Sequence, residues 1–148
     1  MAVRITPTRI LCWLFSALLL AGLLPGGLHD DWDFSQISRR ATGLYGPLGA
    51  GQQRIDDWQQ LLATQKQGSE LEQLKVVNLF FNKRVRYVED IDLWNQVDYW
   101  ETPIEALWKG AGDCEDYAIA KYFSLRRLGV SSDKLRITYV KALRQNRA

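Results

Sequence analysis

One cysteine stands in a sequence context that suits nucleophilic chemistry. Cys114 follows the segment Gly110-Ala111-Gly112-Asp113 and precedes Glu115-Asp116-Tyr117, where a helical pattern begins. The glycines allow a tight turn and a close approach of a substrate backbone. Backbone N–H groups at a helix N-terminus favour a thiolate, and a cysteine placed there is typical of enzyme nucleophiles. The alternative is a small buried hydrophobic residue, against which the acidic neighbours argue.

The carboxylates beside Cys114 oppose the formation of a thiolate. Asp113 and Glu115 carry like charges, which raise the pKa of a thiol. A bound cation would cancel this effect, and Ca²⁺ prefers clustered oxygen ligands. The wider stretch 89–116 contains nine acids and one base, Lys109. The pattern predicts a calcium site; the alternatives are a solvated acidic face, with Asp113 only a helix cap and Glu115 only a complement to the helix dipole.

The N-terminus has the pattern of an export signal. Arg4 and Arg9 precede an uncharged apolar run over residues 10–24, which Pro25-Gly26-Gly27 ends. We expect residues 1–27 to be a secretory signal or an uncleaved N-terminal anchor, and residues 28–148 to be part of one domain. Cys12 lies inside the signal, so cleavage would leave one thiol, which cannot form an internal disulfide.

The charge balance argues against a nucleic-acid partner. After residue 25 the chain carries as many acids as bases, and no basic patch stands out.

Helical spacing and cap signals predict the elements that position the cysteine. Residues 28–53 are rich in polar residues and glycine and indicate a loop or extended arm. Helices are expected over 54–65, from the capping box at Ser69, from Thr102 to Gly110, and from Asp113 to Gly129. The buried stripe of the last helix is expected at Ala118, Tyr122 and Leu125. Short strands are expected at 84–88 and 135–142, with an acidic and aromatic loop over 89–101.

The segments around the cysteine resemble a known family. Trp100-Glu101-Thr102-Pro103-Ile104-Glu105-Ala106-Leu107, Gly110 to Tyr122 and Leu128-Gly129-Val130 are similar to the nucleophile region of bacterial transglutaminase-like cysteine proteinases, and most similar to the LapG group. The resemblance runs from about Trp32 to the last residue. It implies an α+β, papain-like fold, in which a nucleophile helix packs on an antiparallel sheet.

The same resemblance implies an activity and partners. The family uses a Cys-His-Asp triad, and Cys114 matches its nucleophile. Its members are periplasmic, need Ca²⁺ and cleave the N-terminal region of a large surface adhesin near a double alanine, which controls biofilm attachment. A membrane receptor for cyclic-di-GMP, of the LapD type, sequesters them. Asp113 and Glu115 match calcium-binding positions, and Asp92, Asn95 and Asp98 are candidates for the remaining ligands.

The sequence departs from the family pattern after the nucleophile. No histidine follows Cys114, and the single histidine, His29, lies at the signal boundary. A thiol without its base loses both its activator and the proton donor for the leaving amine. We therefore expect the chain to be a fragment that lacks most of the sheet and has no protease activity alone. Other hypotheses are a calcium- or receptor-binding remnant, and acyl transfer by a transglutaminase or amidase.

Overall fold

In the computed structural model, which describes residues 32–140, the chain is mainly helical with a two-stranded sheet. The chain divides into residues Met1–Trp32 and Asp33–Ala148, and the fold below belongs to the second unit. The expected signal segment and His29 lie outside the described residues. The elements in order are α2 (Phe34–Tyr45), α3 (Ala50–Gln65), α4 (Glu70–Arg84), β1 (Arg86–Tyr87), α5 (Asp90–Leu93), α6 (Pro103–Lys109), β2 (Ala111–Gly112), α7 (Cys114–Arg127) and the 3₁₀ helix η1 (Ser132–Lys134).

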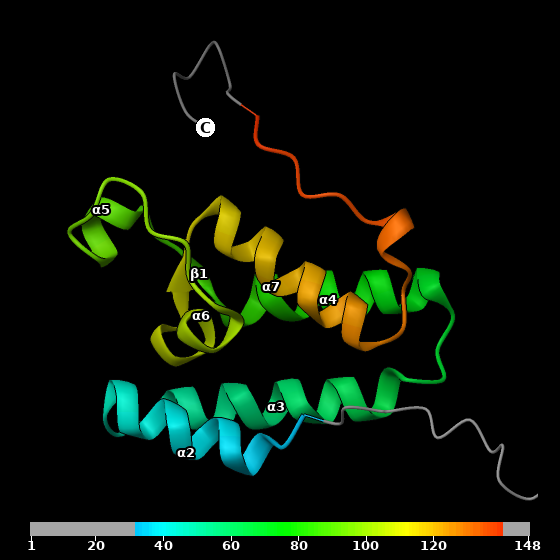
Figure 1. The fold of residues 1–148 in the computed structure, drawn as a ribbon, viewed down its shortest axis with the longest axis horizontal. Helices are drawn as coiled ribbons and strands as arrows, with labels where there is room; N and C mark the ends of the chain where they lie inside the picture. The colour runs from blue at the N-terminus through cyan, green and yellow to red at the C-terminus, as the bar shows by residue number, and fades with distance from the viewer. Residues whose placement is uncertain (1–31, 141–148) are drawn as a thin grey trace, which may run out of the picture. The chain divides into compact units, whose positions relative to one another are not determined.

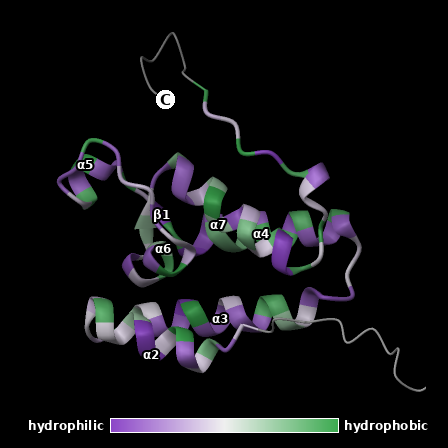
Figure 2. Cartoon of the chain, viewed as in Figure 1, coloured by the Kyte–Doolittle hydropathy of each residue, from purple (hydrophilic) through white to green (hydrophobic). Residues whose placement is uncertain are grey.

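The helices pack as neighbouring pairs around one core. Helix α2 lies against α3, α3 against α6, and α4 against α7, as Figure 1 shows. Each long helix carries hydrophilic and hydrophobic residues together, as expected for helices with one buried face (Figure 2). None of the helices within residues 32–140 combines the length and hydrophobicity that a membrane span requires.

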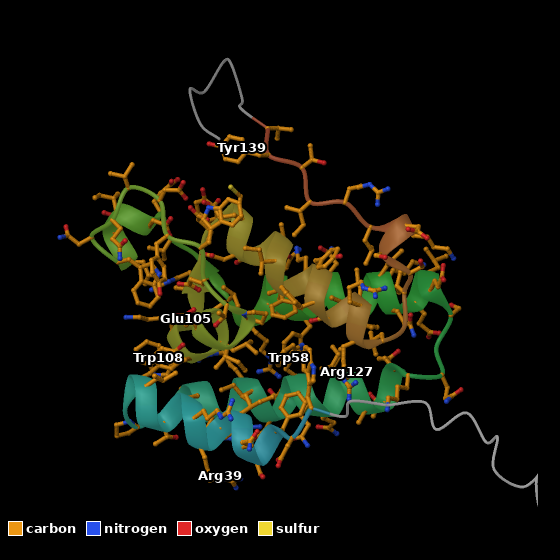
Figure 3. The ribbon with its side chains drawn as sticks, in the orientation of Figure 1. Arg39, Trp58, Glu105, Trp108, Arg127 and Tyr139 are labelled. Carbon is orange, nitrogen blue, oxygen red and sulfur yellow. The ribbon has the colours of Figure 1, made fainter. Side chains whose placement is uncertain are left out.

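Trp58 of α3 contacts residues of α2, α4 and α7. Its side chain is 1% exposed and lies between Phe34 and Phe81, with ring centroids 5.5 and 6.4 Å away (Figure 3). Its indole Nε1 donates a hydrogen bond to Ser124 Oγ at 2.9 Å, and Ser124 Oγ donates to Ala120 O at 2.7 Å. A buried indole needs such a partner, so this pair fixes α7 against α3.

The cap signals in the sequence are confirmed. Ser69 Oγ accepts from Glu72 N at 3.3 Å at the start of α4. Thr102 and Glu105 form the reciprocal capping box of α6, with Pro103 in its first turn. Gly129 follows the end of α7 with φ of 99°, the left-handed conformation expected of a helix-terminating glycine.

Several expectations for the secondary structure are wrong. Residues 34–45, expected to be loop, form α2, because Asp33 caps the helix through Gln36 N and Phe34 and Ala41 are buried. Residues 135–140 are extended but form no strand, since no neighbouring strand pairs with them among the described residues. Residues 141–142 of that expected strand lie outside the description.

The sheet and the buried face of α7 also differ from expectation. The α+β class is confirmed, but β1 and β2 pair in parallel, with Arg86 opposite Ala111 and Tyr87 opposite Gly112, because a long connection through α5 and α6 separates them. Helix α7 buries Asp116, Ala120, Ser124 and Leu125, whereas Ala118 and Tyr122 are half-buried. Two of the four buried residues, Asp116 and Ser124, are polar, and the spacing of apolar residues does not predict their burial.

Candidate active site

The sheet and a half-buried arginine position the segment before Cys114. The backbone pairs with β1 on both sides of β2, through Arg86 N to Gly110 O at 2.9 Å and Val88 N to Gly112 O at 3.0 Å. The Arg54 guanidinium donates to Leu107 O and, at 2.7 Å, to Trp108 O, and so satisfies carbonyls at the end of α6. The chain then turns at Gly110 and enters α7 at Cys114.

Cys114 is the first residue of α7, and its side chain is exposed. Its Sγ donates to Glu115 Oε2 at 3.0 Å. Burial of part of the thiol, followed by its hydrogen bond to Glu115 and the charges of Glu115 and Asp113, raises the pKa of Cys114 to about 11. Burial and the acidic neighbours together therefore outweigh the helix N-terminus, and the thiol is protonated at neutral pH.

Asp116 joins the cysteine helix to the loop before α6. Its Oδ2 accepts from Asp113 N at 2.9 Å, and its Oδ1 accepts from Glu101 N at 2.7 Å. Asp116 and Glu101 are each only 1% exposed, so the carboxylates of both residues are buried. They lie so close to Gly112 that an added Cβ there would be 2.8 Å from Asp116 Oδ2 and 3.2 Å from Glu101 Oε2.

Five carboxylates gather next to Cys114. Asp90, Asp113 and Asp116 place one oxygen each within 4.8 Å of one another, and so do Asp90, Asp98 and Glu115. Asp90 and Asp113 are buried, and each has an oxygen, Oδ1, with no hydrogen-bond partner. Buried polar atoms are rarely left without a partner, so these oxygens fit a bound cation.

The predicted calcium ligands are partly brought together. Asp113, Glu115 and Asp98 belong to the acidic groups, whereas Asp92 belongs to none of those found within residues 32–140. Asn95 adopts a left-handed φ of 55° in the turn, and its role as a ligand stays a prediction.

Asp90 and Asp116 are additional members that the sequence analysis did not single out. The spacing of Asp113 and Asp116 matches a capping box, which is a signal for the inward turn of Asp116. For Asp90, which comes from another segment, the sequence holds no comparable signal.

Burial, and then the charges of neighbouring acids, raise the pKa of three acids at the site, and Glu101 and Asp113 keep their protons at neutral pH. Burial, followed by the charge of Asp116, raises the pKa of Glu101 to about 8. Burial, followed by its hydrogen bond with Glu115, raises the pKa of Asp113 to about 8. Burial also raises the pKa of Asp116 to about 6. Such a cluster is stable when ionised only if positive charge enters it.

Aromatic side chains fix the acidic loop on α6. Trp94 Nε1 donates to Glu101 Oε1 at 2.6 Å, and Tyr99 OH donates to Glu105 Oε1 at 2.8 Å. The backbone N of Tyr99 donates to Asp90 Oδ2 at 2.6 Å, which brings Asp90 into the cluster. The Lys109 ammonium lies 4.4 Å from the Trp94 ring centroid and 4.7 Å from that of Trp108, the residue labelled on α6 in Figure 3.

The exposed Cys114 at the start of α7 and the carboxylates around it lie in the segment whose sequence resembles a protease family. The family model described as bacterial transglutaminase-like cysteine proteinase matches residues 52–147. The chain belongs to this family of cysteine peptidases.

Solved structures of LapG from Legionella pneumophila are similar to this chain. One matches at 38% sequence identity with a TM-score of 0.63, and covers 78% of this chain and 62% of its own. Its EGTA-treated form matches with a TM-score of 0.63, and its calcium-bound form with 0.62, both at 38% identity. The chain therefore spans about three-fifths of the LapG chain. No curated protein sequence gives a significant match.

The close packing around Gly112 gives a first prediction. Gly112→Ala places a methyl group against Asp116 Oδ2 and Glu101 Oε2, so the carboxylates must move, and we expect the free energy of unfolding to fall by about 1–3 kcal/mol. Gly43→Ala is the matched control, because the space around its Cβ is open and alanine favours the helix. Urea unfolding measures both. An unchanged stability for Gly112→Ala would contradict the packing described for the site.

The raised pKa of Glu101 predicts a pH dependence of stability in the absence of divalent cations. Between the ordinary pKa of 4.5 and about 8, the folded protein keeps a proton that the unfolded chain releases. The free energy of unfolding therefore falls as pH rises through this window. Glu101→Gln keeps the oxygen that accepts from Trp94 and cannot ionise, so its stability should fall less steeply. Identical slopes for the two proteins in urea unfolding at several pH values would contradict the assignment.

Proposed function

We propose that the protein is a calcium-dependent cysteine endopeptidase with Cys114 as its nucleophile. The observation that carries the proposal is the position of Cys114 at the start of α7, exposed and next to buried carboxylate oxygens without partners. The membership in a cysteine proteinase family supports the same chemistry.

Cys114 Sγ would attack the carbonyl carbon of a peptide bond, and the C–N bond would break as the leaving amine takes up the thiol proton. Water would then hydrolyse the thioester, which releases the new carboxyl terminus and restores the thiol. The Cys114 N–H at the helix start is oriented by the same turn as the sulfur, and helix N-termini stabilise negative charge on a reacting oxygen. The family uses a histidine to take the thiol proton, and residues 32–140 contain none. The complete triad is therefore part of the proposal and not of the described structure.

The carboxylates of the cluster would hold the cation. Asp90, Asp98, Asp113, Asp116 and Glu115 offer the oxygen ligands that Ca²⁺ prefers. When bound, the ion supplies positive charge that offsets the acids around the thiol. The calcium-bound and EGTA-treated forms of the similar LapG support this choice of metal.

The family resemblance supports a proposal for the substrate and the compartment. We propose that the protein works in the periplasm, exported by its N-terminal segment, and cleaves a large surface adhesin that controls biofilm attachment. A LapD-type receptor for cyclic-di-GMP in the inner membrane is its proposed regulatory partner.

The proposed activity predicts the effect of one substitution. A form of the protein that also carries the family's histidine, incubated with an N-terminal fragment of the adhesin and Ca²⁺, should cleave it, and Cys114→Ala in that form should lower the rate by about 10³-fold or more. Cys12→Ser is the matched control, since it removes the other cysteine and should leave cleavage unchanged. EGTA should stop cleavage and added Ca²⁺ should restore it. Cleavage by Cys114→Ala, with its fold intact by circular dichroism, would remove Cys114 as the nucleophile.

The position of the acids predicts which of them bind calcium. Asp113→Asn and Glu115→Gln should each weaken Ca²⁺ binding at least about tenfold, because each removes a charge next to the ion. Asp92→Asn is the control, since Asp92 is exposed and outside the acidic groups. Isothermal titration calorimetry measures the affinities. If Asp113→Asn and Glu115→Gln both bind Ca²⁺ with the affinity of the wild type, Asp113 is only a helix cap and Glu115 only a complement to the helix dipole.

A further inference from the structure

A groove of about 120 Å³ lies next to Cys114. It is lined by Cys114, Glu115, Ala118 and Ile119 of α7, by residues 137–140, and by Trp100. Figure 3 labels Tyr139 on the extended segment that follows η1. Apart from Glu115, Thr138 and the sulfur, the lining side chains are mostly hydrophobic. A peptide bound here would contact Sγ directly, so we take this groove as the substrate site of the proposed protease.

Trp100 belongs both to this groove and to the surroundings of the acidic cluster. Its side chain is 57% exposed, and its indole Nε1 donates to Asp98 Oδ1 at 2.9 Å. Asp98 is also one of the three acids, with Asp90 and Glu115, whose oxygens lie within 4.8 Å of one another. One hydrogen bond thus connects a wall of the groove to a carboxylate of the cluster.

This connection has a physical consequence for the groove. Asp98 is exposed, and so is Trp100, so packing holds neither side chain in a single position. A cation bound to Asp98 limits the orientations of the Asp98 carboxylate. Because the Trp100 indole donates to this carboxylate, the orientations of the indole are limited as well. A side chain that hydrogen-bonds a metal-binding residue orients that residue and changes the affinity for the metal. The position of the Trp100 indole and the binding of the cation should therefore depend on each other.

We propose that Trp100 is a positioning residue that couples cation binding at the acidic cluster to the shape of the groove beside Cys114. The inference rests on the proposed function, because it takes the cluster as the cation site and the groove as the substrate site. Since coupling is reciprocal, a ligand in the groove changes the affinity for the cation by the same factor as the cation changes the affinity for that ligand.

Two thiol reagents of different shape test the coupling without any cleavage reaction. Iodoacetamide is small, whereas N-phenylmaleimide carries a ring that fits an apolar groove. Both react with the thiolate, so the ratio of their rates at Cys114 cancels changes in the thiolate fraction and reports the groove. Mass spectrometry of the peptide that contains Cys114 keeps Cys12 out of the measurement.

We expect Ca²⁺ to change this ratio by about fivefold in the wild type and to leave it nearly constant in Trp100→Phe, which keeps a ring but lacks the indole N–H. Asp98→Ala, which removes the acceptor, should behave in the same way. Trp108→Phe is the matched control, because Trp108 stacks on Tyr45 away from the cluster, and should respond like the wild type. The change of tryptophan emission with Ca²⁺ should likewise be reduced in Trp100→Phe and kept in Trp108→Phe.

Calorimetry with Ca²⁺ separates the possible failures. If the wild type binds Ca²⁺ and its ratio does not change, or changes equally in Trp100→Phe, the coupling through Trp100 is wrong while the cation site stands. If the wild type binds no Ca²⁺, the cation site of the proposed function is wrong, and this inference is overturned with it.

Discussion

The carboxylate of Asp116 connects the two segments from which the site is built. One of its oxygens accepts the backbone N–H of Asp113, and the other accepts that of Glu101, so the start of the cysteine helix and the end of the acidic loop share one buried group. The carboxylate requires Gly112, because any side chain there would occupy the same space. The position of Cys114, one residue after Asp113, depends on this arrangement.

The same arrangement concentrates negative charge where burial makes it costly. Asp113 and Glu115 could be predicted as members of the acidic cluster because they flank Cys114 in the sequence and resemble family positions. Asp90 lies at the start of α5 and Glu101 at the end of the acidic loop, and hydrogen bonds with Tyr99 N, Trp94 Nε1 and Asp116 hold them near the cysteine helix. The buried acids lower the stability of the fold at this site, a cost that is common at functional sites and that a bound cation would offset.

The fold could be predicted where local chemistry decides it. The capping box at Thr102 and the terminating Gly129 depend on neighbouring residues, and both are found as predicted. The inner face of α7 could not, because Asp116 and Ser124 are buried for the hydrogen bonds that they make with distant groups. The strand expected from residue 135 likewise depends on a partner strand, which a pattern along the chain does not reveal.

The central claim is that positive charge at the acidic cluster makes Cys114 reactive. Its most direct test is the pH dependence of Cys114 alkylation by iodoacetamide, measured in Cys12→Ser with saturating Ca²⁺ and with EGTA. The account predicts an apparent pKa of about 11 in EGTA and a value lower by about one unit or more with Ca²⁺. The same pH profile in both conditions would contradict it.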